Sequence, residues 1–362
     1  MKLMNSPRGR AGSRPVRPCR WLRTAPGWLT IIAAYSGMLA SASSAPGADP
    51  DPRALLRGVE AARNGIKSGR VELVVDSLSQ WSDKRNPRPT RLLVAFDGAN
   101  CRFDQFTREM TFKYGLENAD EKLKAMDYDR EAFARADLGT FRDEHIRSSW
   151  DGEWLVQYSN GGGACIRDEK KGSGYYIFDI RTLGINSYHG MVTNVARSLD
   201  DRANRTLALV GREDVAGHPT WHVRMVDQYA DYSSEFHLWI EDVPGFPVWK
   251  TEENSPYQKT TVTCEYASPV AEKPLPTLVH ALTFDRDGRQ IGSHTIRSEK
   301  AELNITVDPD AWSLASMGIP LGGVVSDERI HQIAGYFDGV GLRANINEAL
   351  HPERVDLKHF RP

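Results

Sequence analysis

Two histidines, His218 and His222, are close enough in the sequence to be considered as ligands of one metal ion. Spaced by four on a helix, they could share one metal ion. Pro219 and the alternating run TWHVRMV instead predict a turn that enters a strand, where positions four apart lie roughly 13 Å from each other. We therefore expect no shared metal here. His237, in the alternating run EFHLWIE, is interpreted as a half-exposed strand residue.

The sequence was also searched for a calcium site, a phosphate-binding loop and catalytic motifs, and none is complete. Asp285-Arg286-Asp287-Gly288 is similar to the opening of a calcium loop, but the later oxygen ligands are missing, which favours a hairpin turn. Gly161-Gly162-Gly163 lacks the Lys-Ser/Thr of a phosphate-binding loop. The chain contains no G-x-S-x-G and no H-E-x-x-H motif. We therefore predict no catalytic residue, no metal and no cofactor. A hydrolase whose triad assembles from distant residues stays an alternative.

Seven tryptophans follow residue 42, and three of them, Trp221, Trp239 and Trp249, lie in consecutive strand-like runs. Large aromatic side chains commonly fill sheets and cores. The same side chains could also line a site for a sugar or a lipid. Both interpretations stay open at the level of the sequence.

The N-terminus has the layout of a secretory signal peptide. Seven basic residues and no acidic residue precede the apolar residues 28–39, and the small residues 40–45 follow. The apolar stretch 28–42 has 15 residues, fewer than the roughly 18–20 that an uncleaved membrane anchor needs. Ala40 and Ala42 form an A-x-A site, which predicts cleavage after residue 42. We expect an exported protein in the periplasm or cell envelope.

The charge balance argues against nucleic acid as a partner. Seven of the 46 basic residues lie in the first 42 residues, whereas all 48 acidic residues lie beyond them, so the exported part has a formal net charge of −9. Phosphate backbones would be repelled on average. Short basic pairs such as Lys84-Arg85 are interpreted as solvated loop charges.

Three cysteines, Cys101, Cys165 and Cys264, remain in the exported part. An odd number leaves at least one thiol unpaired in an oxidising compartment. Each cysteine lies in a strand-like run, which favours buried thiols, although a Cys101–Cys165 disulfide stays open because the spacing selects no pair. No C-x-x-C motif is present to indicate zinc binding or redox exchange.

The elements that must position these residues begin with a helix. Asp51 is a natural N-cap, Pro52 fits the first helical position, and Gly69 follows the last periodic residue. The apolar residues of the stripe are Leu55, Val59, Ala62 and Ile66. Such a stripe needs a sheet to cover it, and the alternation from residue 71 predicts a strand directly after the helix.

Hairpins dominate the rest of the chain. Asp-Gly pairs separate strand-like runs at Asp97-Gly98, Asp151-Gly152 and Asp287-Gly288, and such pairs favour tight turns between antiparallel strands. Further strand-like runs are residues 205–211, 220–227, 235–241, 246–252, 260–266, 291–299 and 303–307; residues 120–136 and 189–199 have helical spacing. The pattern predicts an α+β fold in which β dominates, with one strongly curved antiparallel sheet and helices covering its concave face.

A family resemblance rests mainly on residues 207–253. The run LALVGREDVAGHPTWHVRMVDQ, with a V-x-G turn at Val215 and Gly217, is followed by LWIE and FPVWK. It resembles the LolA-like superfamily of periplasmic lipoprotein-carrier and lipoprotein-sorting proteins, including related sensor domains that regulate envelope-stress sigma factors. The leading helix with VELVVDS and the closing LNITVDPDAWSL are also similar. The resemblance implies an unclosed β-barrel with helices in its mouth and an apolar cavity for an acyl chain or a peptide.

Residues 178–185 and 318–339 are similar to sets of uncharacterised exported proteins from planctomycete-type bacteria, which implies lineage and no activity. Together these patterns predict a signal peptide (1–42), a spacer (43–50), a LolA-like curved-sheet domain (51–316) and a C-terminal tail (317–362).

We expect a non-catalytic exported protein that binds a lipoprotein acyl chain or a lipid in the concavity and meets the membrane only transiently, if at all. A protein-interaction or sensor module that engages another envelope protein is the alternative, and a hydrolase is the third. The candidate ligand-lining residues are Leu55, Val59, Ile66, Trp221, Trp239 and Trp249.

Overall fold

The computed structural model describes most of the chain after residue 48. The described residues are 49–79, 89–113, 115–126, 129–150, 154–160, 163–167, 179–185, 204–267 and 275–350. The chain divides into two units, Met1–Ala48 and Asp49–Pro362, and every described residue belongs to the second. The expected signal peptide lies outside the described residues, so its cleavage stays a prediction.

The first helix, α1 (Pro52–Asn64), begins as its residues predict. The Asp51 side chain caps the helix by accepting a hydrogen bond from the backbone N–H of Arg53 at 3.0 Å. The helix ends at Asn64 with Gly65 as its C-cap, so Ile66 of the expected helical stripe lies beyond it, and Gly69 already belongs to the first strand, β1 (Ser68–Ser79). The buried side chains of α1 are Leu55, Leu56, Val59 and Arg63.

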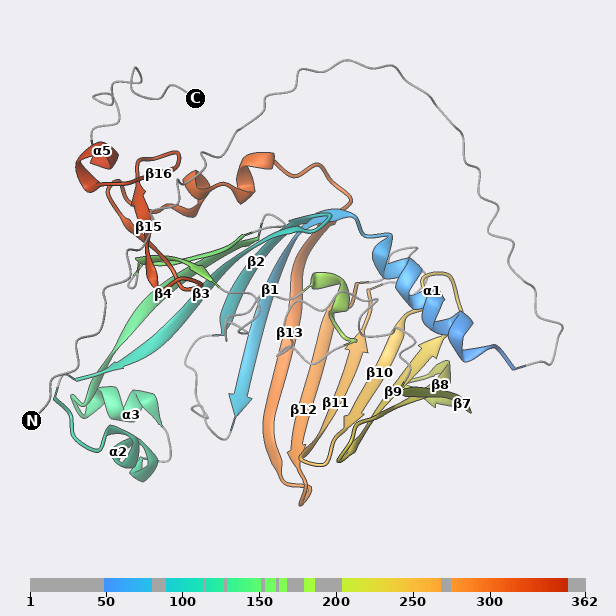
Figure 1. The fold of residues 1–362 in the computed structure, drawn as a ribbon. Coiled ribbons are helices and arrows are strands. Elements are labelled where there is room, and N and C mark those ends of the chain that lie inside the picture. Colours follow the sequence, from blue (N-terminus) through green and yellow to red (C-terminus); the bar gives the residue numbers. More distant parts are fainter. Residues whose placement is uncertain are drawn as a thin grey trace, which may run out of the picture. The chain divides into compact units, whose positions relative to one another are not determined.

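The described strands form one sheet of 16 strands, which curves and does not close (Figure 1). Its order is β16-β15-β14-β6-β5-β4-β3-β2-β1-β13-β12-β11-β10-β9-β8-β7, so β16 and β7 are its edges. Neighbours are antiparallel except β6 and β14, which are parallel. A β-dominant fold built on one curved, unclosed sheet is thus confirmed, and one parallel pair is added to it.

The strands of the first half are β1, β2 (Thr90–Asp97), β3 (Asn100–Phe112), β4 (Gly139–Trp150), β5 (Leu155–Ser159) and β6 (Gly163–Arg167). The second half contains β7 (Arg205–Val215), β8 (His218–Gln228), β9 (Ser233–Glu241), β10 (Val248–Asn254), β11 (Gln258–Glu265), β12 (Leu278–Asp285) and β13 (Gln290–Leu303). The C-terminal strands are β14 (Val324–Asp327), β15 (Gln332–Phe337) and β16 (Leu342–Arg343).

Two of the three expected Asp-Gly hairpins are confirmed. Gly98 has a φ of 59° between β2 and β3, and Gly288 has a φ of 77° between β12 and β13. The Asp285 carboxylate accepts hydrogen bonds from the backbone N–H groups of Asp287 and Arg289, at 3.0 and 2.9 Å. The calcium-like run is therefore a turn. Asp151-Gly152 lies outside the described residues.

Some boundaries differ from the sequence-based expectation. Residues 120–136 form two short helices, α2 (Ala119–Ala125) and α3 (Arg130–Arg135), rather than one. Residues 303–307 do not form a strand of their own, because Asn304 adopts a φ of 55° directly after β13 and ends the ladder. The expected helix at 189–199 lies outside the described residues.

The C-terminal residues that the sequence sets apart as a tail take part in the sheet. β14 pairs with β6 through Val325 and Ala164, and β15 and β16 extend the sheet beyond it. Two single-turn helices, η3 (Pro309–Trp312) and η4 (Leu314–Met317), precede these strands, and a last helix, α5 (Ile346–Leu350), follows them. Residues 351–362 lie outside the described part.

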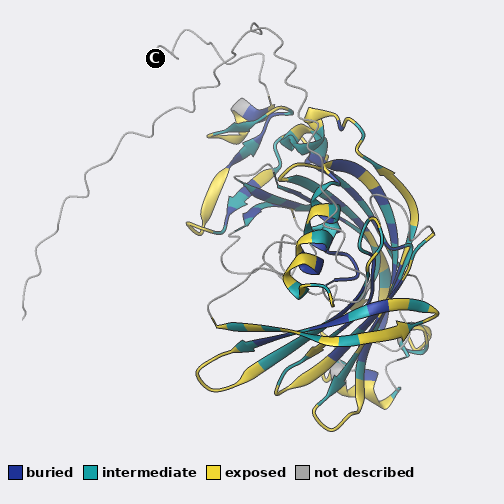
Figure 2. Cartoon of the chain, turned by 90° about the vertical axis from the view of Figure 1, so that its right-hand side faces the viewer, coloured by how far each residue is buried: buried dark blue, intermediate teal, exposed yellow. Residues whose placement is uncertain are grey.

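Helix α1 lies inside the curve of the sheet (Figure 2). We call the face that α1 covers the inner face and the opposite one the outer face. Two clusters of buried apolar side chains occupy the inner face: the first joins α1 to β8, β9 and β10, and the second joins Ile66 to β1, β2 and β11–β13. A helix on the concave face was expected and is present.

Candidate functional site

The first cluster of the inner face lies between α1 and the strands β8–β10. Leu55 and Val59 of the helix, with exposures of 2% and 0%, pack with Val223 of β8 and Leu238 of β9. Trp221 is partly buried at the edge of the same cluster. Because side chains alternate along a strand, the odd positions of β8 and the even positions of β9 point toward α1. Apart from Arg63, the buried side chains of α1 are apolar.

The second cluster continues the inner face under a short segment, residues 179–185, which contains the single-turn helix η2 (Ile180–Thr182). Ile180 and Leu183 of this segment pack on the sheet together with Ile66. The close approach requires glycine at 184, because its φ is 79° and an added Cβ would lie 2.5 Å from Cys264 Sγ. The segment thus covers the inner face next to α1.

A pocket of about 200 Å³ opens on the inner face at β2–β4. Its apolar walls include Phe96, Phe103, Trp150 and Ile180. The volume is smaller than the roughly 300–1,000 Å³ of a site that encloses a whole small ligand. Asp179 and Arg181, which form an ion pair at 2.7 Å, also line this pocket, so its lining is mixed with apolar side chains in the majority.

The inner face has little chemical reactivity among its described residues. Burial raises the pKa of the Cys101 thiol at the pocket, and that of the Cys264 thiol, to about 12. Both thiols are therefore protonated near neutral pH and are poor nucleophiles. Cys101, Cys165 and Cys264 are all free, so the Cys101–Cys165 disulfide is not formed.

The six candidate lining residues fall into three places. Leu55, Val59 and Trp221 meet in the first cluster, and Ile66 belongs to the second. Trp239 and Trp249 are on the outer face, although their exposures are only 5% and 6%. Trp239 pairs across the strands with His222 and Trp221 pairs with Ile240, so the two tryptophans project from opposite faces.

The outer face of β7–β9 carries a hydrogen-bonded row of ionisable side chains, which we call the outer network: Glu213, His222, His237 and Glu235. His222 Nδ1 lies 2.7 Å from Glu213 Oε1, and His222 Nε2 lies 2.8 Å from His237 Nδ1. His237 Nε2 lies 3.4 Å from Glu235 Oε2. Trp239 Nε1 donates to the other Glu213 oxygen at 2.7 Å, and the Trp239 ring stacks on His222.

The surroundings of the outer network shift the pKa values of several of its members. Burial, followed by the charge of His222, lowers the pKa of His237. The hydrogen bond from Trp239 lowers the pKa of Glu213, and that from Arg224 lowers the pKa of Glu235.

The sequence did not reveal this network. It predicts His237 as a half-exposed strand residue, and His237 is partly buried in β9, with a side-chain exposure of 14%. The partners Glu213, His222 and Glu235 come from three strands, so the hairpin register is needed to see that they meet. The one available signal is the alternation of Glu235, His237, Trp239 and Glu241 with apolar residues in the run EFHLWIE.

These imidazoles do not form a hydrolase-like site. No serine, threonine or cysteine hydrogen-bonds to the His222 or His237 ring among the described residues. His218, which the sequence places near His222, instead stacks on Trp249 and lies 3.3 Å from Glu241. In the described part of the chain, no three or more His, Cys, Asp or Glu side chains are arranged so that they could hold a metal ion.

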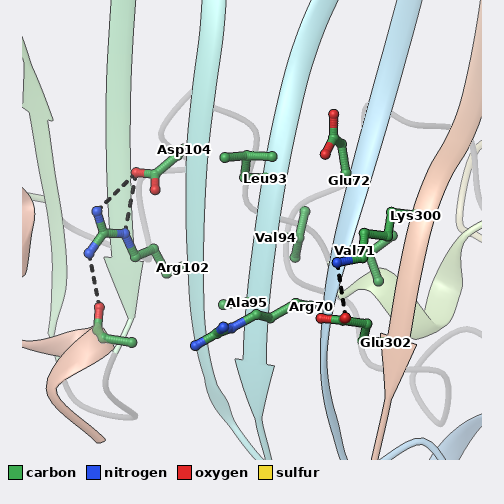
Figure 3. A pocket seen from close by; sticks show the side chains of 11 residues that line it. Arg70, Val71, Glu72, Leu93, Val94, Ala95, Arg102, Asp104, Lys300 and Glu302 are labelled. Atoms are coloured by element: carbon green, nitrogen blue, oxygen red, sulfur yellow. Dashed lines mark hydrogen bonds and ion pairs between the residues drawn. The ribbon is translucent and has the colours of Figure 1, made fainter. Parts of the chain in front are cut away.

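A second hollow, of about 370 Å³, lies on the outer face over β1–β3 and β13 (Figure 3). Its charged side chains are largely paired with each other. Arg102 donates to Asp104, to the carbonyl of Ala311 and to the hydroxyl of Ser316, and Lys300 lies 2.9 Å from Glu302. These bonds fasten η3 and η4 to the sheet, which gives Arg102 a structural role.

None of the helices in the described residues is both long enough and apolar enough to cross a membrane.

The chain was compared with known proteins by sequence and by structure. No family model matches it, and no curated protein matches its sequence. Among solved structures, an outer membrane lipoprotein-sorting protein domain from Vibrio parahaemolyticus is similar at 7% identity and a TM-score of 0.42, covering 74% of this chain and 97% of that chain. A LolA superfamily protein from Nitrosomonas europaea is similar at 12% identity and a TM-score of 0.39, covering 73% and 98%.

The lipoprotein LppX of Mycobacterium tuberculosis is similar at 9% identity and a TM-score of 0.28, covering 72% of this chain and 99% of that chain. These structures include the superfamily that the sequence resembles. At such identities the likeness concerns the fold alone, so function has to be argued from the residues of this chain.

Proposed function

We propose that this protein is exported and binds a hydrophobic ligand, a lipoprotein acyl chain or a lipid, against the inner face of its sheet without catalysing a reaction. The observation that carries the proposal is the apolar inner face itself. It runs from the α1 cluster to the pocket lined by Phe96, Phe103 and Trp150, and it is covered by one short helix and by residues 179–185. Apolar concave surfaces of this kind are the usual sites for apolar ligands.

The proposed lining follows the geometry of the inner face. Leu55, Val59, Ile66 and Trp221 belong to it, together with the pocket residues Phe103 and Trp150. The position of Trp239 and Trp249 on the outer face removes them from the proposed lining. Their indole N–H groups are already engaged by Glu213 and Glu241.

Binding is tested with the purified protein in two ways. Mass spectrometry of an organic extract identifies co-purified lipid, and the fluorescence of cis-parinaric acid reports binding of an added apolar chain. Trp221→Ala should weaken probe binding about tenfold, which corresponds to a loss of about 1.4 kcal/mol of apolar contact with the probe. Trp239→Ala is the matched control on the neighbouring strand and should leave the probe affinity unchanged. Absence of both co-purified lipid and probe binding would refute the proposal.

Export is tested separately. Mass spectrometry of the protein recovered from the periplasm should find an N-terminus at Ser43, because cleavage is expected after Ala42. A chain that stays in the cytoplasm with residues 1–42 attached would contradict the location.

A second candidate function, a module that binds another envelope protein, is favoured by the C-terminal strands. Ile330 and Ile333 are each 57% exposed and Val340 is 82% exposed. Deletion of residues 317–362 is a poor test, because β14 pairs with β6 and its loss would disturb the sheet. Ile330→Asp with Ile333→Asp should instead abolish co-purification of a partner while probe binding persists. Unchanged co-purification would refute this function.

A further inference from the structure

Arg63 differs from the rest of the inner face because it is charged and fully buried, with an exposure of 0%. It lies one helical turn after Val59 of the first cluster and three residues before Ile66 of the second. The guanidinium is also close enough to Cys264 and Tyr266 for its charge to act on both groups. Arg63 thus lies where the two apolar clusters of the inner face meet.

The hydrogen bonds of Arg63 are incomplete. Its Nη2 donates to the Tyr266 hydroxyl at 3.3 Å, whereas Nε and Nη1 have no partner. The Tyr266 hydroxyl is itself fully used, because it donates to the Val248 carbonyl at 2.9 Å and accepts from the Val248 N–H at 3.2 Å. No carboxylate of the described residues forms an ion pair with Arg63. The positive charge is therefore uncompensated.

An uncompensated guanidinium is costly to bury, because it loses its hydration and cannot release its proton. Arg205, a partly buried residue whose side chain is largely covered, shows how such a charge is usually compensated. Arg205, with a side-chain exposure of 7%, forms a two-pronged pair with the Asp227 carboxylate at 2.6 and 2.7 Å. Arg63 has the same need for an oxyanion and lacks a protein group that meets it.

We propose that Arg63 binds the anionic head group, a carboxylate or a phosphate, of the ligand whose apolar chain lies on the inner face. This inference rests on the proposed function. The second cluster extends from Cys264, near Arg63, to Phe103 at the pocket, and so offers an apolar path for the chain. Since Arg63 is fully buried, the head group reaches it only when α1 or residues 179–185 shift. The ligand class is an anionic amphiphile.

The first test needs no variant. The purified protein is titrated with cis-parinaric acid and with its methyl ester, which has the same chain and no charge. The acid should bind about 10- to 100-fold more tightly, as expected for hydrogen bonds to a charged group. Equal affinities for acid and ester would overturn the proposal while leaving the proposed function intact. Failure of both probes to bind would refute the proposed function itself.

The second test assigns the preference to Arg63. Arg63→Met should abolish the preference for the acid and leave the ester affinity unchanged, whereas Arg63→Lys should keep part of it. Arg57→Met is the control, because Arg57 is on the same helix with a side-chain exposure of 68%. Arg63→Met should be at least as stable as wild type in thermal unfolding, since it removes an uncompensated charge. An acid preference that survives in Arg63→Met would overturn the assignment.

The third test separates a lipid head group from a free anion. Excess inorganic phosphate is added during titration with the acid and with the ester. A head-group site predicts little competition, because free phosphate lacks the apolar chain that contributes most of the affinity. If phosphate raises the melting temperature of wild type but not of Arg63→Met, and the acid shows no preference, the site serves a free anion and the amphiphile proposal is wrong.

Discussion

The two faces of the strands β7–β10 are built from neighbouring residues and have opposite chemistry. Toward α1 the strands present Val223, Leu238 and Ile240, each with an exposure of 0%. On the outer face the same strands present His222, His237 and Trp239, joined to carboxylates by hydrogen bonds. One face is stabilised by removing apolar surface from water and the other by satisfying buried polar groups.

The comparison shows that residue type alone does not assign a tryptophan to a ligand site. Trp221 is partly buried and Trp239 is buried; they lie on adjacent strands, yet they project from opposite faces. Trp221 packs with apolar neighbours, while Trp239 donates to Glu213 and stacks on His222. The face of the sheet decides which of them could meet an apolar ligand.

The largest expected difference between the two faces is in the loss of stability when a side chain is truncated to alanine. Leu238→Ala should lower the free energy of unfolding by about 3 kcal/mol, because it leaves a cavity under α1. His237→Ala, one residue away on the outer face, should cost about 1 kcal/mol, the typical value of a hydrogen bond. Urea denaturation of both variants measures the difference. Equal costs would show that the outer network contributes as much as the apolar clusters.

A smaller effect is expected at the centre of the outer network. Glu213→Gln removes the carboxylate that accepts from Trp239 and His222, and should cost about 1 kcal/mol after allowance for its partly exposed side chain. The fluorescence spectrum of Trp239 should change as well, because its indole loses a charged acceptor. Probe binding at the inner face should be unaffected; a change there would show that the two faces are coupled.

The outer network should contribute to the pH dependence of stability, in addition to His145, whose pKa is also lowered by burial. The lowered pKa of His237 means that the unfolded chain takes up a proton first, so stability falls as the pH drops from near 6.5 toward the pKa of the folded state. The lowered pKa values of Glu213 and Glu235 extend this loss below pH 4.5.

Urea denaturation between pH 7 and 5 measures this slope. It should be reduced in the variant His237→Gln, which cannot titrate. Binding of the uncharged methyl ester to the inner face should change little over the same range. A slope that persists unchanged in His237→Gln would place its origin elsewhere.

The smallest expected effect concerns the cation above Trp239. Lys250 Nζ lies 4.1 Å from the centre of the Trp239 ring and 3.2 Å from Glu252. Lys250→Met should cost about 0.5 kcal/mol, the value of a partly exposed cation–π contact. Urea denaturation followed by tryptophan fluorescence measures it. A cost above that of Glu213→Gln would make Lys250, rather than Glu213, the main support of the network.

Capping and turn residues in the sequence were sufficient to predict many of the helices and hairpins. Asp51 and Pro52 predict the start of α1, and the pairs Asp97-Gly98 and Asp287-Gly288 predict two hairpins. These signals work because capping and positive-φ turns depend on a few adjacent residues. The curved β-dominant fold and the helix on its concave face were also predicted. Of the proposed lining, Leu55, Val59, Ile66 and Trp221 were named from the sequence.

Only the tertiary structure decided which distant residues meet. The parallel pairing of β14 with β6 joins residues about 160 positions apart and incorporates the C-terminal residues into the sheet. The row from Glu213 to Glu235 depends on the register of three strands, and the unpaired state of Arg63 depends on its burial against Tyr266, 203 residues away. The alternation of side chains along a strand assigns each residue to one face of the sheet. Which residues it contacts depends on the register of the neighbouring strands and on burial, and both are set by long-range packing that no local sequence pattern encodes.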